Sequence, residues 1–141
     1  MSKTLKRGYI ALCVVSILNF IYDNYTVIAR THIGQASGGL LGKVHDLLFS
    51  NVPVLIISMF IPLIVSIIVS IIVFVLYRKA LTKPTAILVT LGFVPYLLFN
   101  ISTFCSAMGI IIVGIIKVIY SIIMTIFMLK DIKRLSVEED S

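Results

Sequence analysis

Four long stretches of the sequence are almost purely apolar, and each is long enough to cross a lipid bilayer as a helix. A hydrocarbon core of about 30 Å needs roughly 20 helical residues. Because lipid offers no hydrogen-bond partner to exposed backbone groups, such stretches must be helical. The sequence therefore predicts an all-α integral membrane protein, a four-helix transmembrane bundle that forms a single domain over residues 1–141. The four spans are expected at residues 8–29, 52–77, 85–104 and 108–129.

The composition excludes the main soluble alternatives. Of the 141 residues, 60% are hydrophobic and only 13% are charged, and a soluble domain of this size could not bury so much apolar surface. The net charge of +6 does not indicate nucleic-acid binding, because the basic residues gather at the ends of the apolar stretches and mark topology. We therefore expect the lipid bilayer as the surrounding partner and no nucleic acid.

Lysine and arginine outside the spans are distributed unevenly between the two sides of the predicted membrane. Loops rich in these residues stay in the cytoplasm. Only Arg30 and Lys43 lie on one side, so both termini are predicted to be cytoplasmic and residues 30–51 to form an outer loop. The high isoleucine content fits an AT-rich bacterial genome, so we expect the bacterial plasma membrane, which is the cell inner membrane. The nine residues on the cytoplasmic side are Lys3, Lys6, Arg7, Arg78, Lys79, Lys83, Lys130, Lys133 and Arg134.

Two segments outside the spans have patterns of their own. In residues 40–49 the apolar residues recur at helical spacing, which predicts a short helix that lies in the outer membrane interface and caps the bundle. Residues 34–39, rich in glycine, predict a flexible link before it. The cytoplasmic tail, residues 130–141, ends in an acidic run at 136–141 that we expect to be disordered and solvated.

Prolines and one short turn shape the later spans. Pro62 and Pro95 lie in the middle of spans two and three, where they predict kinks. The sequence Cys105-Ser106-Ala107 predicts a turn of about three residues between spans three and four. The alternative is that these two spans merge into one long apolar hairpin.

Every span carries one stripe of small or polar residues, as expected where helices pack against each other in lipid. The stripe of the first span also repeats every three or four residues, the spacing of a left-handed coiled coil. Tyr22 flanks this stripe, which consists of Ser16, Asn19, Asp23, Thr26 and Arg30.

Asp23 and Lys117 differ from the rest because they are ionisable and lie well inside predicted spans. A charge there costs about 2.5–3.5 kcal/mol on insertion scales, and such residues usually pair. Their depths differ by about 4.5 Å at 1.5 Å per residue, which a lysine side chain can bridge. Ser58 and Asn100 fall at a similar level. We predict an intramembrane polar layer of these four residues, with Asn19 and Tyr22 beside it.

The predicted layer has two interpretations. It is either a structural ion pair that fixes the register of the helices, or a functional site. As a site, Asp23 would exchange a proton or a cation, or the layer would recognise the transmembrane helix of a partner.

Catalytic and metal-binding patterns are missing from the sequence. It contains no Ser-His-Asp set, HExxH, CxxC or glycine-rich phosphate loop. His32 and His45 share the outer loop without an accompanying cysteine or carboxylate cluster, so no metal site is predicted. We expect neither an enzyme nor a cofactor.

Size and topology suggest two functional classes. Four short helices with an acid in the first resemble the small multidrug resistance transporters, although their motif around a membrane glutamate is absent. The outline is also similar to small polytopic immunity proteins that protect bacteria from pore-forming bacteriocins. We therefore expect a non-catalytic protein that recognises another membrane protein, as an immunity, exclusion or accessory subunit, or that assembles with itself. The alternative is a small oligomeric transporter or channel that uses the Asp23 and Lys117 pair.

Overall fold

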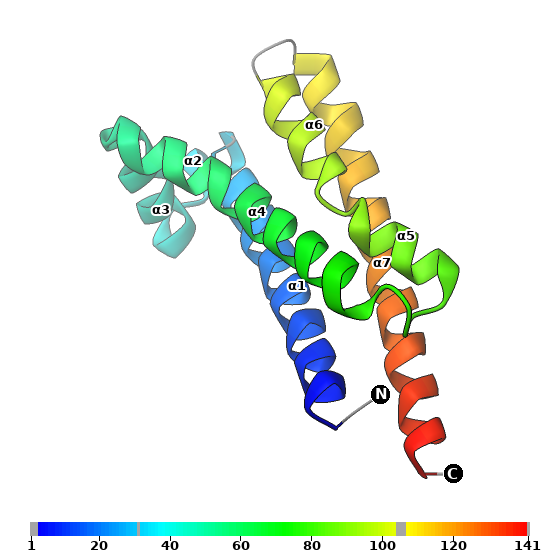
Figure 1. Ribbon diagram of the computed structural model, residues 1–141. Coiled ribbons are helices and arrows are strands. Elements are labelled where there is room, and N and C mark those ends of the chain that lie inside the picture. Colours follow the sequence, from blue (N-terminus) through cyan, green and yellow to red (C-terminus); the bar gives the residue numbers. More distant parts are fainter. Residues whose placement is uncertain (1–2, 31, 104–106, 141) are drawn as a thin grey trace.

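The chain forms a bundle of two helical arms that separate toward one end (Figure 1). The computed structural model describes residues 3–30, 32–103 and 107–140, and all regular elements in these ranges are helical. Four helices are long and apolar enough to span a membrane: Lys3–Ala29, Val52–Tyr77, Lys83–Thr103 and Gly109–Val137. The all-α class and the number of apolar helices are therefore as the sequence predicts. Both termini lie at the same end of the bundle (Figure 1).

The first arm pairs helix α1 (Lys3–Ala29) with helix α4 (Val52–Ile72), which continues as the π-helical turn η1 (Val73–Tyr77). The two helices approach each other closely at the end of the bundle that holds both chain termini. The Tyr77 hydroxyl donates a hydrogen bond to the Leu5 carbonyl at 2.7 Å, and a Cβ at Gly8 would lie only 2.5 Å from the Tyr77 oxygen. Glycine at position 8 thus lets η1 reach the backbone of α1.

The second arm pairs helix α7 (Ala107–Asp140) with helices α5 (Lys83–Thr90) and α6 (Val94–Thr103). The third span is interrupted at Leu91–Phe93, directly before Pro95. Proline lacks the N–H that would continue the helix, so the predicted break near Pro95 is confirmed. Helix α4, in contrast, runs through Pro62 as one element. Of the predicted turn at Cys105-Ser106-Ala107, the first two residues lie outside the described ranges.

Two short helices pack beside the first arm, at its end away from the chain termini (Figure 1). They are α2 (His32–Ser37) and α3 (Gly39–Ser50), and they are joined at Gly38 and Gly39, whose φ angles of 67° and 59° favour glycine. Helix α3 covers the segment 40–49 that the spacing predicts to be helical, whereas its place at a membrane interface remains a prediction. The expected flexible link at 34–39 is wrong, since α2 includes most of it.

The tail differs most from expectation. Helix α7 has 34 residues, about 51 Å at 1.5 Å per residue, so it continues far beyond the predicted span end at Leu129. The acidic run is helical to Asp140, and the expectation of disorder there is wrong. The reason is that no glycine or proline follows Gly114, and that Asp131 and Leu135 are buried against the rest of the bundle.

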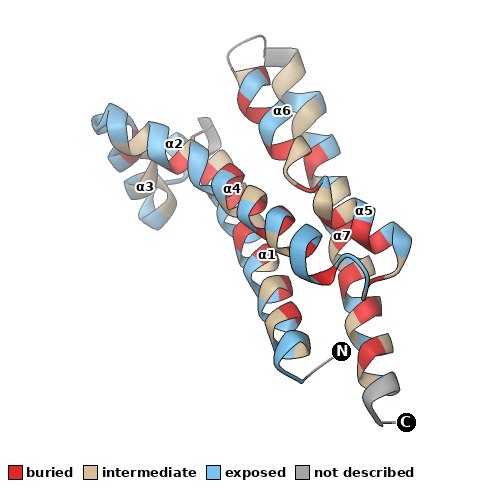
Figure 2. Cartoon of the chain, viewed as in Figure 1, coloured by how far each residue is buried: buried red, intermediate tan, exposed pale blue. Residues whose placement is uncertain are grey.

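The apolar core lies in the half of the bundle that holds both chain termini. It is formed by side chains from both arms, and Figure 2 shows buried positions on the faces where the helices meet. The ring centroids of Tyr9 and Tyr77 are 5.4 Å apart. The arms therefore pack tightly at this end. The core consists of Tyr9, Cys13, Val69, Val73, Tyr77, Leu81, Ala86, Val89, Met124, Met128 and Leu135.

Asp131 fastens α7 to the start of α5. Its carboxylate, 3% exposed, accepts hydrogen bonds from the Thr82 backbone N–H at 3.0 Å and from the Thr82 hydroxyl at 3.1 Å. Arg134 donates to the Ala80 carbonyl at 2.8 Å. Because Thr82 is the N-cap residue of α5, Asp131 supplies the negative charge that favours this helix end.

We predict that Asp131→Ala lowers the stability of the bundle by about 1.5–3 kcal/mol, the usual range for a hydrogen bond to a charged group. Denaturant unfolding of the purified protein in detergent measures the loss. The matched control is Asp46→Ala, which removes an exposed carboxylate from α3. Equal losses in the two variants would show that the Asp131 contacts contribute nothing specific.

Candidate functional site

The polar stripe of α1 faces the interior of the bundle. Ser16, Asn19, Asp23 and Thr26 are all buried, between 4% and 9% exposed. The three- and four-residue spacing keeps them on one side of the helix. Tyr22, predicted to flank the stripe, is 37% exposed and lies outside the buried set.

Asp23 and Lys117 form a salt bridge between α1 and α7. Asp23 is 4% and Lys117 1% exposed, so both charges are withdrawn from the surroundings of the bundle. The Lys117 Nζ also lies 3.8 Å from the ring centroid of Phe99 and 5.6 Å from that of Tyr96. These aromatic faces add cation–π attraction, and the lysine is held by one carboxylate and two rings.

The other predicted members of the layer are buried but do not bond to this pair. Ser58 and Asn100 are 6% and 7% exposed, yet the Ser58 hydroxyl donates to the Leu55 carbonyl of its own helix. The Asn19 amide donates to the Pro62 carbonyl at 3.1 Å and so links α1 to α4. Within the described ranges, the structure thus joins Asp23 to Lys117 and buries Asn19, Ser58 and Asn100 without a bond to this pair.

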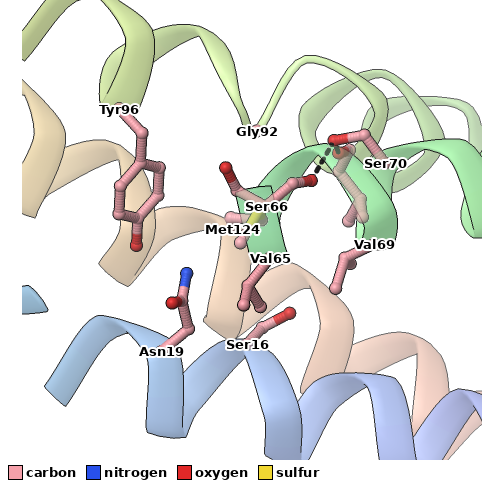
Figure 3. A pocket seen from close by; sticks show the side chains of 10 residues that line it. Ser16, Asn19, Val65, Ser66, Val69, Ser70, Gly92, Tyr96 and Met124 are labelled. Carbon is pink, nitrogen blue, oxygen red and sulfur yellow. Dashed lines mark hydrogen bonds between the residues drawn. The ribbon is translucent and has the colours of Figure 1, made fainter. Parts of the chain in front are cut away.

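A small cavity lined by both polar and apolar side chains lies between α1, α4 and the second arm (Figure 3). Ser16 and Asn19 line it from α1, and Ser66 and Ser70 from α4, with Tyr96 opposite. Its volume of about 20 Å³ is room for one water molecule, which needs roughly 10–15 Å³ and two to four polar partners. The cavity is too small for a larger solute.

The polar stripe stops at the terminal end of the bundle. Past Ser16, the inward positions of α1 are Cys13 and Tyr9, 2% and 0% exposed, and they belong to the apolar core. The Tyr9 hydroxyl is buried and has no hydrogen-bond partner in the described part of the chain. The core therefore closes the seam on the side of the termini.

The opposite end of the bundle is open. Between the two arms lies a cleft of two adjoining chambers, with volumes of about 320 and 410 Å³. Val27, Phe99 and Ile110 line both of them. The first chamber is completed by Arg30, Phe49, Leu55, Met59 and Thr103, and the second by Asn24, Ile111, Gly114, Ile115, Lys117, Val118 and Ile119.

Arg30 lies at the edge of this cleft, one residue beyond α1. Its Nε donates to the Thr26 carbonyl at 3.3 Å, which suits a cation at the C-terminal end of a helix. Burial is the main influence on its pKa and lowers it, while the negative charge of Asp23 opposes this shift. The guanidinium remains charged in a partly apolar site.

Metal-binding groups do not gather in the described part of the chain, where no cluster of three His, Cys, Asp or Glu residues occurs. The His45 Nδ1 lies 2.6 Å from the Ala29 carbonyl and ties α3 to the end of α1. The side chain of His32 lies outside the described part of the chain.

Comparisons with protein-family models, with curated proteins and with solved structures found no match to this chain. Function is therefore inferred from the geometry of the site.

We predict that Lys117→Met destabilises the bundle by about 3–5 kcal/mol, because it leaves the Asp23 carboxylate buried without a partner. The double variant Asp23→Asn with Lys117→Met removes both charges and should be more stable than Lys117→Met. Unfolding by a denaturing detergent measures both, with Lys83→Met at an exposed position as the control. A double variant no more stable than Lys117→Met would contradict the pairing.

Proposed function

We propose that this chain is a multi-pass membrane protein with both termini in the cytoplasm, and that it recognises another membrane protein without catalysing a reaction. A bacterial plasma membrane is the proposed location. The single observation that carries the proposal is that Asp23 and Lys117 satisfy each other inside one chain, in a seam that the core closes toward the termini. This arrangement favours a structural role for the charges over passage of a solute.

Helix α3 offers the best surface for recognition. It is anchored on one side by Leu48, 4% exposed, and by the contact of His45 with Ala29. On its other side Leu40 and Leu47, seven residues apart and thus on one face, are 73% and 59% exposed. A rigid apolar face on the outer side, beyond the four spans, suits contact with a partner of the immunity, exclusion or accessory-subunit type.

Recognition predicts a specific neighbour at this face. A photo-crosslinking amino acid at Leu47 should give one protein adduct of constant mass in native membranes. The same group at Ile71 of α4, 57% exposed, is the matched control and should react with lipid. If position 47 also gave only lipid adducts, α3 would be an interfacial helix resting on the bilayer, and this surface would carry no recognition.

A small transporter or channel is the second candidate, favoured by the fact that Lys117 lines the second chamber of the cleft. The test is proton or solute flux into liposomes that contain the purified protein. We expect no flux above that of empty liposomes. Flux in the wild type that disappears in Asp23→Asn would overturn the recognition proposal in favour of transport.

A further inference from the structure

The outer cleft has the size of a ligand site. Its chambers of about 320 and 410 Å³ fall within the range of roughly 300–1,000 Å³ that is common for small-molecule pockets. They lie next to each other, because Val27, Phe99 and Ile110 line both. Such a space between the arms of a membrane protein does not fill with water when its walls are apolar.

One polar group stands out at the edge of this apolar space. Arg30 lines the first chamber, and of its three guanidinium nitrogens only Nε has a hydrogen-bond partner in the described part of the chain, the Thr26 carbonyl. The terminal nitrogens of a guanidinium form a planar fork that binds a carboxylate or a phosphate with two parallel hydrogen bonds. The site therefore has an unused anion-binding group next to an apolar pocket.

The local charge balance points to an anion as well. Asp23 is the carboxylate that acts on both Arg30 and Lys117, and it is in contact with Lys117. Two cations thus share one anion. A ligand that brings one negative charge to Arg30 would balance the group.

The geometry also defines the shape of the ligand. Arg30 follows the end of α1, where the headgroups of a bilayer would begin. Asn24, which lines the second chamber, is six residues nearer the middle of the span than Arg30, or about 9 Å at 1.5 Å per residue. The cleft thus takes an anionic head at its edge and a long apolar tail below it.

We propose that the cleft binds one phospholipid of the outer leaflet, with its phosphate on Arg30 and an acyl chain in the two chambers. This proposal depends on the membrane placement given above but not on the recognition of a protein partner.

The test is native mass spectrometry of the delipidated full-length protein in detergent, titrated with phosphatidylglycerol. The wild type should bind one lipid per chain. Arg30→Gln should bind it about ten- to a hundred-fold more weakly, the range for a charge-assisted hydrogen bond. Lys43→Gln is the matched control, since it removes an exposed cation of α3 on the same side, and should bind like the wild type. Equal affinity in Arg30→Gln and the wild type would overturn the proposal.

Two further ligands distinguish binding of the phosphate head from binding of the acyl chains. Diacylglycerol, which has the chains without the phosphate, should bind as weakly to the wild type as phosphatidylglycerol does to Arg30→Gln. Inorganic phosphate should not compete with the lipid. If diacylglycerol bound as tightly as phosphatidylglycerol, or if inorganic phosphate displaced the lipid, a phospholipid site would be contradicted.

A variant that fills the cleft tests the position of the chain. Ile110→Trp places a large ring between the chambers and should weaken lipid binding while Arg30 is intact. Helix content by circular dichroism confirms that each variant is folded. In liposomes, a phospholipid with a photoreactive acyl chain should label Phe99 or Ile110 more than Ile71. Equal labelling of the cleft and of Ile71, or labelling of Ile71 alone, would contradict a defined site.

Discussion

The salt bridge between Asp23 and Lys117 is the contact on which the half of the structure away from the chain termini depends. Both residues lie within apolar helices, where an unpaired charge would cost several kcal/mol, so the charges hold α1 and α7 together wherever the chain is surrounded by lipid. The arms separate toward the end away from the termini (Figure 1), and the cleft lies there. The pair thus joins the two arms at the depth of Asp23 and Lys117, where the apolar contacts alone would not keep them together.

The two halves of the bundle are stabilised in different ways. Near the termini, the Tyr9 and Tyr77 rings, the close approach at Gly8 and the bonds of Asp131 to Thr82 pack the arms together. In the other half, where the cleft separates the arms, a few polar contacts join them. Closure of the bundle near the termini supports our proposal of recognition over passage of a solute.

Much of this architecture follows from the sequence because the lipid environment leaves few choices. Apolar length predicts the four long helices, Pro95 predicts the break in the third, and the depths of Asp23 and Lys117 predict that they can meet. Other features depend on contacts between distant parts of the chain. Asp131 looks like an ordinary residue of a polar tail, and only its bonds to Thr82, 49 positions away, reveal a buried role. The cleft depends on the angle between the arms, which helical spacing does not encode, so Arg30 could be assigned to a stripe but not to a site.

The claim that the ion pair holds the arms together is tested most directly by a distance across the cleft. Spin labels at Ile28 of α1 and Ile101 of α6, 45% and 51% exposed, would be measured by double electron–electron resonance in liposomes, with the native cysteines replaced by serine. If the salt bridge holds the arms together, the wild type should give one narrow distance distribution, and Lys117→Met a broader one shifted to longer distances. Identical distributions in the two proteins would contradict it.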